Sequence, residues 1–307
     1  MNIRAQQSSG QRGERGFIVV AVLWILAALA TLATIFSMYV INTAIAFAVH
    51  DERLQAEALA RAAIELSVYQ VAVNPQAPPS RGTFRFRIAN ADVNAEFKSE
   101  TARIDLNTAP KELLAGLFVT IGAQRAAADY YADRIIGWRA PPPEDNRTDE
   151  PGLYRAAGLP YGPRGASFPH TGELALVHGI PDLMVEKALP FLTVYSRQPQ
   201  INIFNAAPQV VAALPGMDAA RLNAVLVQRE AGPQYAEGLL AMLGPAQTLA
   251  NAQSNKALRV TARIAFDSGQ RMTTEVVIFI LDSGPEPYRV LTWRDDMDDS
   301  GTRVTAR

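Results

Sequence analysis

Histidines, cysteines and nucleophile motifs are the features that could give this 307-residue chain a catalytic or metal centre. Its histidines are His50, His170 and His178, and none has a partner at metal-binding spacing. The chain has no cysteine, which excludes disulfides, thiolate catalysis and cysteine-ligated zinc or iron–sulfur sites. It also lacks a G-x-S-x-G elbow, a P-loop and a G-x-G-x-x-G turn after a strand. The sequence therefore predicts no enzyme and no small-molecule substrate, with His170 and His178 as surface or capping residues.

Composition and charge narrow the class of protein further. Hydrophobic residues make up 49% of the chain, which is enough for a folded core. The 29 Lys and Arg residues nearly balance the 30 Asp and Glu residues. A generic nucleic-acid binder usually carries a basic excess, so we expect no nucleic-acid partner. The length fits two domains or one elaborated domain.

A long apolar segment near the N-terminus predicts a membrane helix. Residues 17–49 carry no charge, and residues 17–41 are apolar except for Thr31, Thr34 and Ser37. About 20 apolar residues in a helix suffice to span a bilayer. Hydroxyl groups can bond back to their own helix and are compatible with this prediction.

The residues before the apolar segment predict its orientation. Residues 1–16 contain Arg4, Arg12 and Arg15 against a single acidic residue, Glu14. Positive charge beside a first membrane helix favours the cytoplasmic side. We therefore expect one membrane crossing, with the body of the protein on the far side.

The helix is expected to continue beyond the membrane to residue 73. Apolar residues recur there at spacings of three or four, which places them on one helical face: Leu54, Ala58, Ala62, Leu66, Tyr69 and Val73. Asn74 and Pro75 end the pattern. This amphipathic half is expected to pack on a sheet of its own domain.

Alternating apolar residues predict strands in two distant parts of the chain. The first part comprises residues 83–88 and 92–101, and the second comprises residues 258–266, 273–281 and 289–292. Residues 267–269 and 282–284 have the composition of turns between strands. The expected architecture is α+β: a long N-terminal helix and an antiparallel sheet, interrupted by a large, mainly helical insertion at about residues 105–255.

The insertion contains a weak internal repeat. NTAP at residues 107–110 and NAAP at residues 205–208 each precede a short apolar helix, a glycine-containing turn and a second helix. We expect Asn107 and Asn205 to cap the first helices, with proline in the first turn. Such helix–turn–helix units can bind DNA phosphates, but no basic cluster flanks these turns, so packing is the favoured interpretation.

The junction between Gly16 and Phe17 resembles the leader of type IV pilins and pseudopilins. The resemblance implies that a prepilin peptidase cleaves between these residues and that the new N-terminus is methylated. Most such proteins carry Glu at the fifth mature position, where this chain has Ala21. A carboxylate inside a bilayer needs a partner, which a subunit at the tip of a filament would lack. Ala21 is therefore what a tip subunit can tolerate.

The order of the elements resembles the protein K family of type II secretion systems. The resemblance rests on the leader, the split strands, the paired NTAP and NAAP units, and the segment GELALVHG at residues 172–179. It implies four parts: a leader at residues 1–16, a membrane helix at 17–41, a pilin-like domain divided between 42–104 and 256–307, and a helical insertion at 105–255. The insertion would comprise two units that resemble sterile-alpha-motif or helix–hairpin–helix folds, at about residues 105–200 and 201–255.

The same resemblance implies a function and partners. The protein would be a minor pseudopilin in the inner membrane, with its C-terminal domain in the periplasm. It would form the tip of the pseudopilus and help to initiate its assembly for protein export. Its partners would be pseudopilins I and J, together with H, and the prepilin peptidase. The alternatives are a minor type IV pilin and a membrane-anchored periplasmic hydrolase or binding domain.

Calcium is a further hypothesis from the resemblance, since family members can bind it in an acidic loop of the insertion. The aspartates of the family pattern are missing here, where the chain reads GWRAPP at residues 137–142. Asp145, Asp149 and Glu150 could supply oxygen ligands, although calcium requires six to eight. The alternative is a solvated, proline-rich loop.

Overall fold

The computed structural model describes residues 12–73, 78–140 and 149–298, which form two compact units of residues 1–58 and 59–307. The first unit is helical and belongs to α1, which runs from Arg12 to Ala72. This matches the expected helix to within a few residues at each end. Within the first unit, Thr31 and Thr34 donate to the carbonyls four residues earlier, both at 2.8 Å, so their hydroxyl groups are satisfied within the helix.

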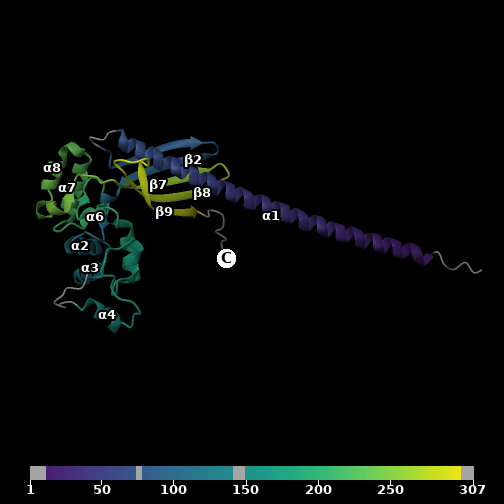
Figure 1. Ribbon diagram of the computed structural model, residues 1–307, viewed down its shortest axis with the longest axis horizontal. Helices are drawn as coiled ribbons and strands as arrows, with labels where there is room; N and C mark the ends of the chain where they lie inside the picture. Colours follow the sequence, from purple (N-terminus) through teal and green to yellow (C-terminus); the bar gives the residue numbers. More distant parts are fainter. Residues whose placement is uncertain (1–11, 74–77, 141–148, 299–307) are drawn as a thin grey trace, which may run out of the picture. The chain divides into compact units, whose positions relative to one another are not determined.

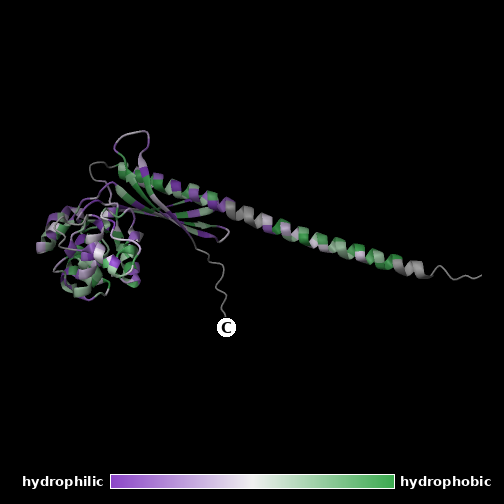
Figure 2. Cartoon of the chain, turned by 60° about the horizontal axis from the view of Figure 1, so that its bottom comes forward, coloured by the Kyte–Doolittle hydropathy of each residue, from purple (hydrophilic) through white to green (hydrophobic). Residues whose placement is uncertain are grey.

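The apolar part of α1 has no polar face. One segment, Ile18–Thr43, is long and apolar enough to cross a membrane, and none of it is buried within the protein. Figure 2 shows hydrophobic residues along this segment and mixed colours farther along the helix. Its side chains therefore require an apolar environment that the chain itself does not provide.

The second unit contains a five-stranded antiparallel sheet in the order β1-β2-β7-β8-β9. Its strands are β1 Arg81–Ile88, β2 Ala91–Ser99, β7 Ala257–Phe266, β8 Arg271–Ile280 and β9 Tyr288–Asp298 (Figure 1). The expected split antiparallel sheet is confirmed, and β9 is longer than the sequence pattern predicts. Hairpin turns with positive φ at Gly269 and Gly284 connect the last three strands.

The end of α1 packs on one face of this sheet. Ile64 and Val68 contact a buried cluster from the sheet, which comprises Phe97, Leu258, Val260, Val276 and Ile278. The helical face predicted from the sequence is wrong, because its residues Leu66, Tyr69 and Val73 are exposed. The buried face instead includes small residues, which let the helix approach the sheet: Ala60, Ala63 and Ser67. Strand alternation places the intervening residues on the opposite face. The sheet therefore has one apolar face and one polar face.

The insertion is mainly helical and has its own buried core, to which Leu113, Phe118, Ile135, Val210 and Leu239 contribute. Its helices are α2 Lys111–Thr120, α3 Arg125–Arg139, α4 Glu150–Ala156, α5 Asp182–Ala188, α6 Pro208–Ala212, α7 Ala219–Arg229 and α8 Ala236–Ala241. Its two-residue strands form two parallel pairs, β3 Ile104–Asp105 with β4 Leu192–Thr193, and β5 Ile201–Asn202 with β6 Ala250–Asn251.

The two halves of the insertion share an Asx turn before the first helix. Asp105 Oδ1 accepts from the Asn107 N–H at 2.8 Å, and Asn202 Oδ1 accepts from the Phe204 N–H at 3.0 Å. In both halves the backbone carbonyl of the first residue also accepts from the N–H four residues later, at 2.9 Å. Each half therefore begins with the same short strand and turn.

In each half of the insertion, an arginine at the end of the second helix bonds back to the turn before the first helix. Arg139, at the end of α3, donates to the Ala109 carbonyl at 2.7 Å. Arg229, at the end of α7, donates to the Ala206 carbonyl at 2.9 Å. Ala109 and Ala206 follow their turns at the same position, so the two arginines perform the same role.

The expected asparagine caps are wrong. Pro110 is the N-cap of α2 and Ala207 is the N-cap of α6, and neither helix has a side-chain cap. When the two halves are aligned on their Asx turns, Pro110 corresponds to Ala207. Aligning the two prolines of the sequence repeat instead shifts the halves by one residue. Asn107 instead bonds to the backbone of Phe168, with Nδ2 donating at 3.0 Å and Oδ1 accepting at 2.7 Å.

Candidate functional site

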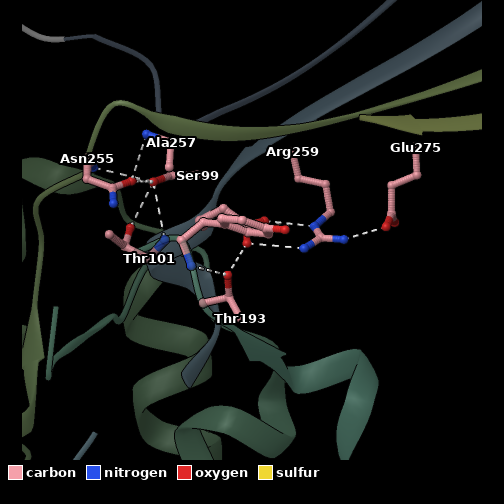
Figure 3. Close-up of polar contacts among 9 residues, drawn as sticks. Ser99, Thr101, Thr193, Asn255, Ala257, Arg259 and Glu275 are labelled. Atoms are coloured by element: carbon pink, nitrogen blue, oxygen red, sulfur yellow. Dashed lines mark hydrogen bonds and ion pairs between the residues drawn. The ribbon is translucent and has the colours of Figure 1, made fainter. Parts of the chain in front are cut away.

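The insertion joins the sheet through two adjacent strands, since it leaves β2 after Ser99 and returns at Ala257 in β7. The Ser99 hydroxyl donates to Asn255 Oδ1 at 3.1 Å, and Asn255 Oδ1 also accepts from the Ala257 N–H at 3.2 Å. Asn255 Nδ2 donates to the Ser196 carbonyl at 2.7 Å. These bonds connect the outgoing chain, the returning chain and the insertion. Figure 3 shows the bonds among Ser99, Asn255 and Ala257.

A buried charge network lies beside these bonds. Glu100 is 1% exposed and accepts two bonds from Arg259, at 2.7 Å from Nε and 3.1 Å from Nη2. The other side of the Arg259 guanidinium pairs with Glu275 on β8, as Figure 3 shows. The Thr193 hydroxyl donates to Glu100 from β4. The network therefore connects β7 and β8 of the sheet to the first turn and a strand of the insertion.

The electrostatics fit a fixed ionic junction. Desolvation disfavours the charge on Arg259, but Glu100 and Glu275 outweigh it and raise the pKa of Arg259. Nearby, burial lowers the pKa of Arg103, and the positive charge of Arg259 lowers it further. A bidentate pair with both oxygens used sets the angle as well as the distance between its partners. We conclude that this junction orients the insertion on the sheet.

Residues 172–179, selected from the sequence, supply a second buried anchor. Glu173 is 5% exposed and accepts from Trp138 Nε1 at 3.0 Å and from Arg164 Nη1 at 3.2 Å. The His178 N–H donates to the Tyr154 hydroxyl at 3.0 Å, and burial raises the pKa of that hydroxyl to about 12. This segment holds α3 and α4 together, which is a structural role.

Two of the three acidic residues proposed as calcium ligands already have partners. Asp149 caps α4 by accepting from the Gly152 N–H at 2.8 Å. Glu150 is buried, and its Oε2 lies 2.6 Å from Nη1 of Arg134. Asp145 lies outside the described residues, and among those described no group of three His, Asp or Glu residues could hold a metal. Asp149 and Glu150 as placed here do not fit a metal site, because Arg134 supplies the cation.

The Arg134–Glu150 pair carries a pH-dependent prediction. Burial raises the pKa of Glu150, while Arg134 lowers it, and the net direction is upward. Arg134→Gln removes the opposing charge, so Glu150 would bind a proton more tightly in the folded state than in the unfolded state. The variant should lose about 1–2 kcal/mol of stability at pH 7.5 and less at pH 5, because the cost grows as pH rises above the ordinary glutamate range. Denaturation curves at the two pH values measure this difference.

The outcome also addresses calcium. Arg155→Gln, at an exposed position of the helix that carries Glu150, is the matched control and should change stability little at either pH. An equal loss at both pH values would contradict the assignment of Arg134 as the counter-ion of Glu150. A higher melting temperature of the unchanged protein with calcium would show that the acidic residues form a metal site after all.

The proposed processing residues lie in the first unit. Gly16 and Phe17 are within the backbone of α1, and Ala21 lies just inside the apolar segment Ile18–Thr43. A helical backbone by itself does not identify a cleavage site. Cleavage, methylation and the role of Ala21 therefore stay predictions.

The chemistry of the junction is positioning and not catalysis. Sequence reasoning missed Glu100, Arg259 and Glu275, because Arg259 occupies a polar position of an alternating strand and looks exposed. The only indication in the sequence is that Arg259 lies on β7, the strand to which the chain returns after the insertion. Only the folded arrangement shows that its partner is 159 residues away.

Comparisons with known proteins agree with the fold. Residues 88–197 match the family model described as type II secretion system, protein K. The crystal structure of the GspK–GspI–GspJ complex from the type 2 secretion system of enterotoxigenic Escherichia coli contains a similar chain. That chain is 18% identical with a TM-score of 0.59, and the match covers 80% of this chain and 98% of that one. No curated protein sequence matches the chain.

Proposed function

We propose that the chain is a minor pseudopilin that forms the tip of the periplasmic pseudopilus, because residues 88–197 match the family model of type II secretion system protein K. At that position it would help to initiate assembly of the filament that exports proteins across the outer membrane. The observation that carries this proposal is the insertion of a paired helical domain between β2 and β7. Such a bulky domain would block a further subunit from stacking above it.

The N-terminal helix supports the same proposal. A chain with an apolar Ile18–Thr43 segment and no acidic residue there can anchor in a membrane and pack with other apolar helices. Ala21 lacks the carboxylate that would need the amine of a subunit ahead. We infer a single-pass inner-membrane protein whose body, residues 42–307, lies in the periplasm.

The remaining assignments belong to this proposal. The pilin-like domain would comprise residues 42–104 and 256–307, and the insertion would comprise two units at about residues 105–200 and 201–255. Since the similar chain was crystallised with GspI and GspJ, we propose pseudopilins I and J as partners, with H and the prepilin peptidase. The role is structural, because the charged residues Glu100, Arg259 and Glu275 at the insertion bind one another in ion pairs. This role needs no small-molecule substrate and no nucleic acid.

Processing provides the first test. In cells with active prepilin peptidase, the mature chain should begin at Phe17 and carry a methylated amine, as mass spectrometry of the purified protein would show. Gly16→Val should retain residues 1–16, because the bulky side chain would sit at the scissile bond. Gly13→Val is the matched control and should be processed normally. An intact leader in the unchanged chain would exclude the pilin-like interpretation.

The same purified material tests the secretion assignment. Pseudopilins I and J should co-purify with the full-length chain extracted from membranes. Recovery with type IV pilins instead would favour the minor-pilin alternative. A processed chain that is monomeric in cells expressing all these proteins would favour a membrane-anchored binding domain.

A further inference from the structure

The polar face of the sheet, opposite α1, carries a cluster of arginines. On this face Arg85, Asn94, Arg263 and Thr273 form one row across β1, β2, β7 and β8. In the next row Arg271 of β8 lies opposite Ala265. These residues line an open groove of about 650 Å³. We call Arg85, Arg263 and Arg271 the arginine face.

The three arginines form no ion pair with any described residue, although β9 shares their face, with Asp296 opposite Thr273 and Asp298 opposite Arg271. All three side chains are exposed, and within residues 12–73, 78–140 and 149–298 none makes a hydrogen bond or an ion pair. Their neighbour Arg87 differs, because it pairs with Asp92 at 2.6 Å and with Asp267 at 2.7 Å. The groove therefore holds three arginines without an ion pair to a described residue beside one arginine that pairs with two aspartates.

A second group in the groove is also unsatisfied. Asn94 lies between Arg85 and Arg263, and its Oδ1 atom is buried without a hydrogen bond from any described residue. Buried polar atoms normally have partners, and those that lack one need an explanation. Reaching this oxygen requires the side chains over it to move, as interface side chains commonly do on binding.

Protection of the sheet edge does not explain the cluster. Charged residues on an edge strand prevent pairing with other chains, and this accounts for Arg85 on β1. Arg263 and Arg271 lie on β7 and β8, which are interior strands with neighbours on both sides. Arginines without partners at those positions favour binding to something outside the chain.

We propose that this face binds a protein partner that lays an extended acidic segment across the sheet. Side-chain carboxylates of the segment match the planar guanidinium groups of Arg85, Arg263 and Arg271. Its backbone N–H groups can donate to Asn94 Oδ1, whereas the phosphate of a lipid headgroup offers mainly acceptors. An acidic peptide segment thus supplies both carboxylates for the arginines and an N–H donor for Asn94 Oδ1.

The test uses the full-length chain in non-ionic detergent and a fluorescent peptide of alternating glutamate and serine. Binding is measured by fluorescence anisotropy at about 50 mM and about 300 mM salt, since screening weakens such contacts. The triple variant Arg85→Gln, Arg263→Gln, Arg271→Gln should weaken binding about tenfold or more, because it removes three charge-assisted contacts. The matched control Arg125→Gln, Arg155→Gln, Lys187→Gln lowers net charge equally in the insertion and should weaken binding by less than about twofold.

The outcomes separate this site from general charge attraction. Equal weakening in both triple variants, or no peptide binding at all, would overturn the proposal. Phosphatidylglycerol vesicles in place of the peptide test the lipid alternative, and a short single-stranded oligonucleotide tests nucleic acid. Tighter binding of either, lost in the first variant alone, would also overturn it. The experiment does not depend on the position of the chain in a filament.

Discussion

Arg259→Gln is expected to lower the free energy of unfolding by about 3–5 kcal/mol, the cost of leaving a buried carboxylate without its ion-pair partner. Glu100 is 1% exposed and receives two of its bonds from this guanidinium. Water cannot replace the lost partner at such a site, and Glu275 loses the same counter-ion. Chemical denaturation of the full-length protein in detergent, followed by tryptophan fluorescence, measures the change.

The control lies on the same strand. Arg263→Gln removes an exposed arginine without an ion pair from β7 and should change stability by about 0.5 kcal/mol or less. The double variant Glu100→Gln, Arg259→Gln should recover part of the loss, because it leaves no unpaired charge in the pair. Equal effects of Arg259→Gln and Arg263→Gln would contradict the assignment of a buried junction.

The same variant reports on function, because the network connects the two parts of the second unit. Thr193 and Glu100 belong to the insertion side, and Arg259 and Glu275 belong to strands of the sheet. Loosening this contact would leave each core intact while freeing the insertion to rotate. If the chain forms the tip of the pseudopilus, as proposed, it would then lose assembly before it loses secondary structure.

Periodicity made most of the fold predictable from the sequence. Residues such as Val260, Ala262 and Ile264 alternate with polar ones and end on the face of the sheet that α1 covers. The face predicted for the end of α1 is wrong, since Leu66 and Tyr69 are exposed and Ile64 and Val68 pack on the sheet instead. Alternation in a strand records which face is buried, whereas large apolar residues of α1 marked the wrong face because small alanines form the contact.

Long-range polar contacts could not be predicted, because local patterns do not record them. Arg259 and Arg263 occupy equivalent polar positions of one strand, yet one is buried in ion pairs and the other has none. Asn107 looked like a helix cap because it precedes a proline and an apolar run. Its amide instead bonds to Phe168, 61 residues away. Each residue's role was decided by which distant segment packs beside it.

Gly116→Ala is expected to destabilise the protein by about 2–3 kcal/mol, although alanine is the better helix former by about 1 kcal/mol. Gly116 lies in α2, where a Cβ atom would overlap the carbonyl oxygen of Ala213 at the end of α6. That oxygen belongs to the backbone, so it cannot turn away as a flexible side chain would. The two helical units can approach this closely only because Gly116 has no side chain.

The sign of the change is the informative result. Gly238→Ala in α8 is the matched control, because an added Cβ there meets no atom within 4 Å. It should therefore stabilise the protein by up to about 1 kcal/mol through helix propensity. Thermal denaturation of both variants distinguishes the two effects, and stabilisation by both would show that α2 and α6 do not meet at Gly116. Destabilisation by Gly116→Ala alone would establish this crossing as the contact that fixes the two halves of the insertion against each other.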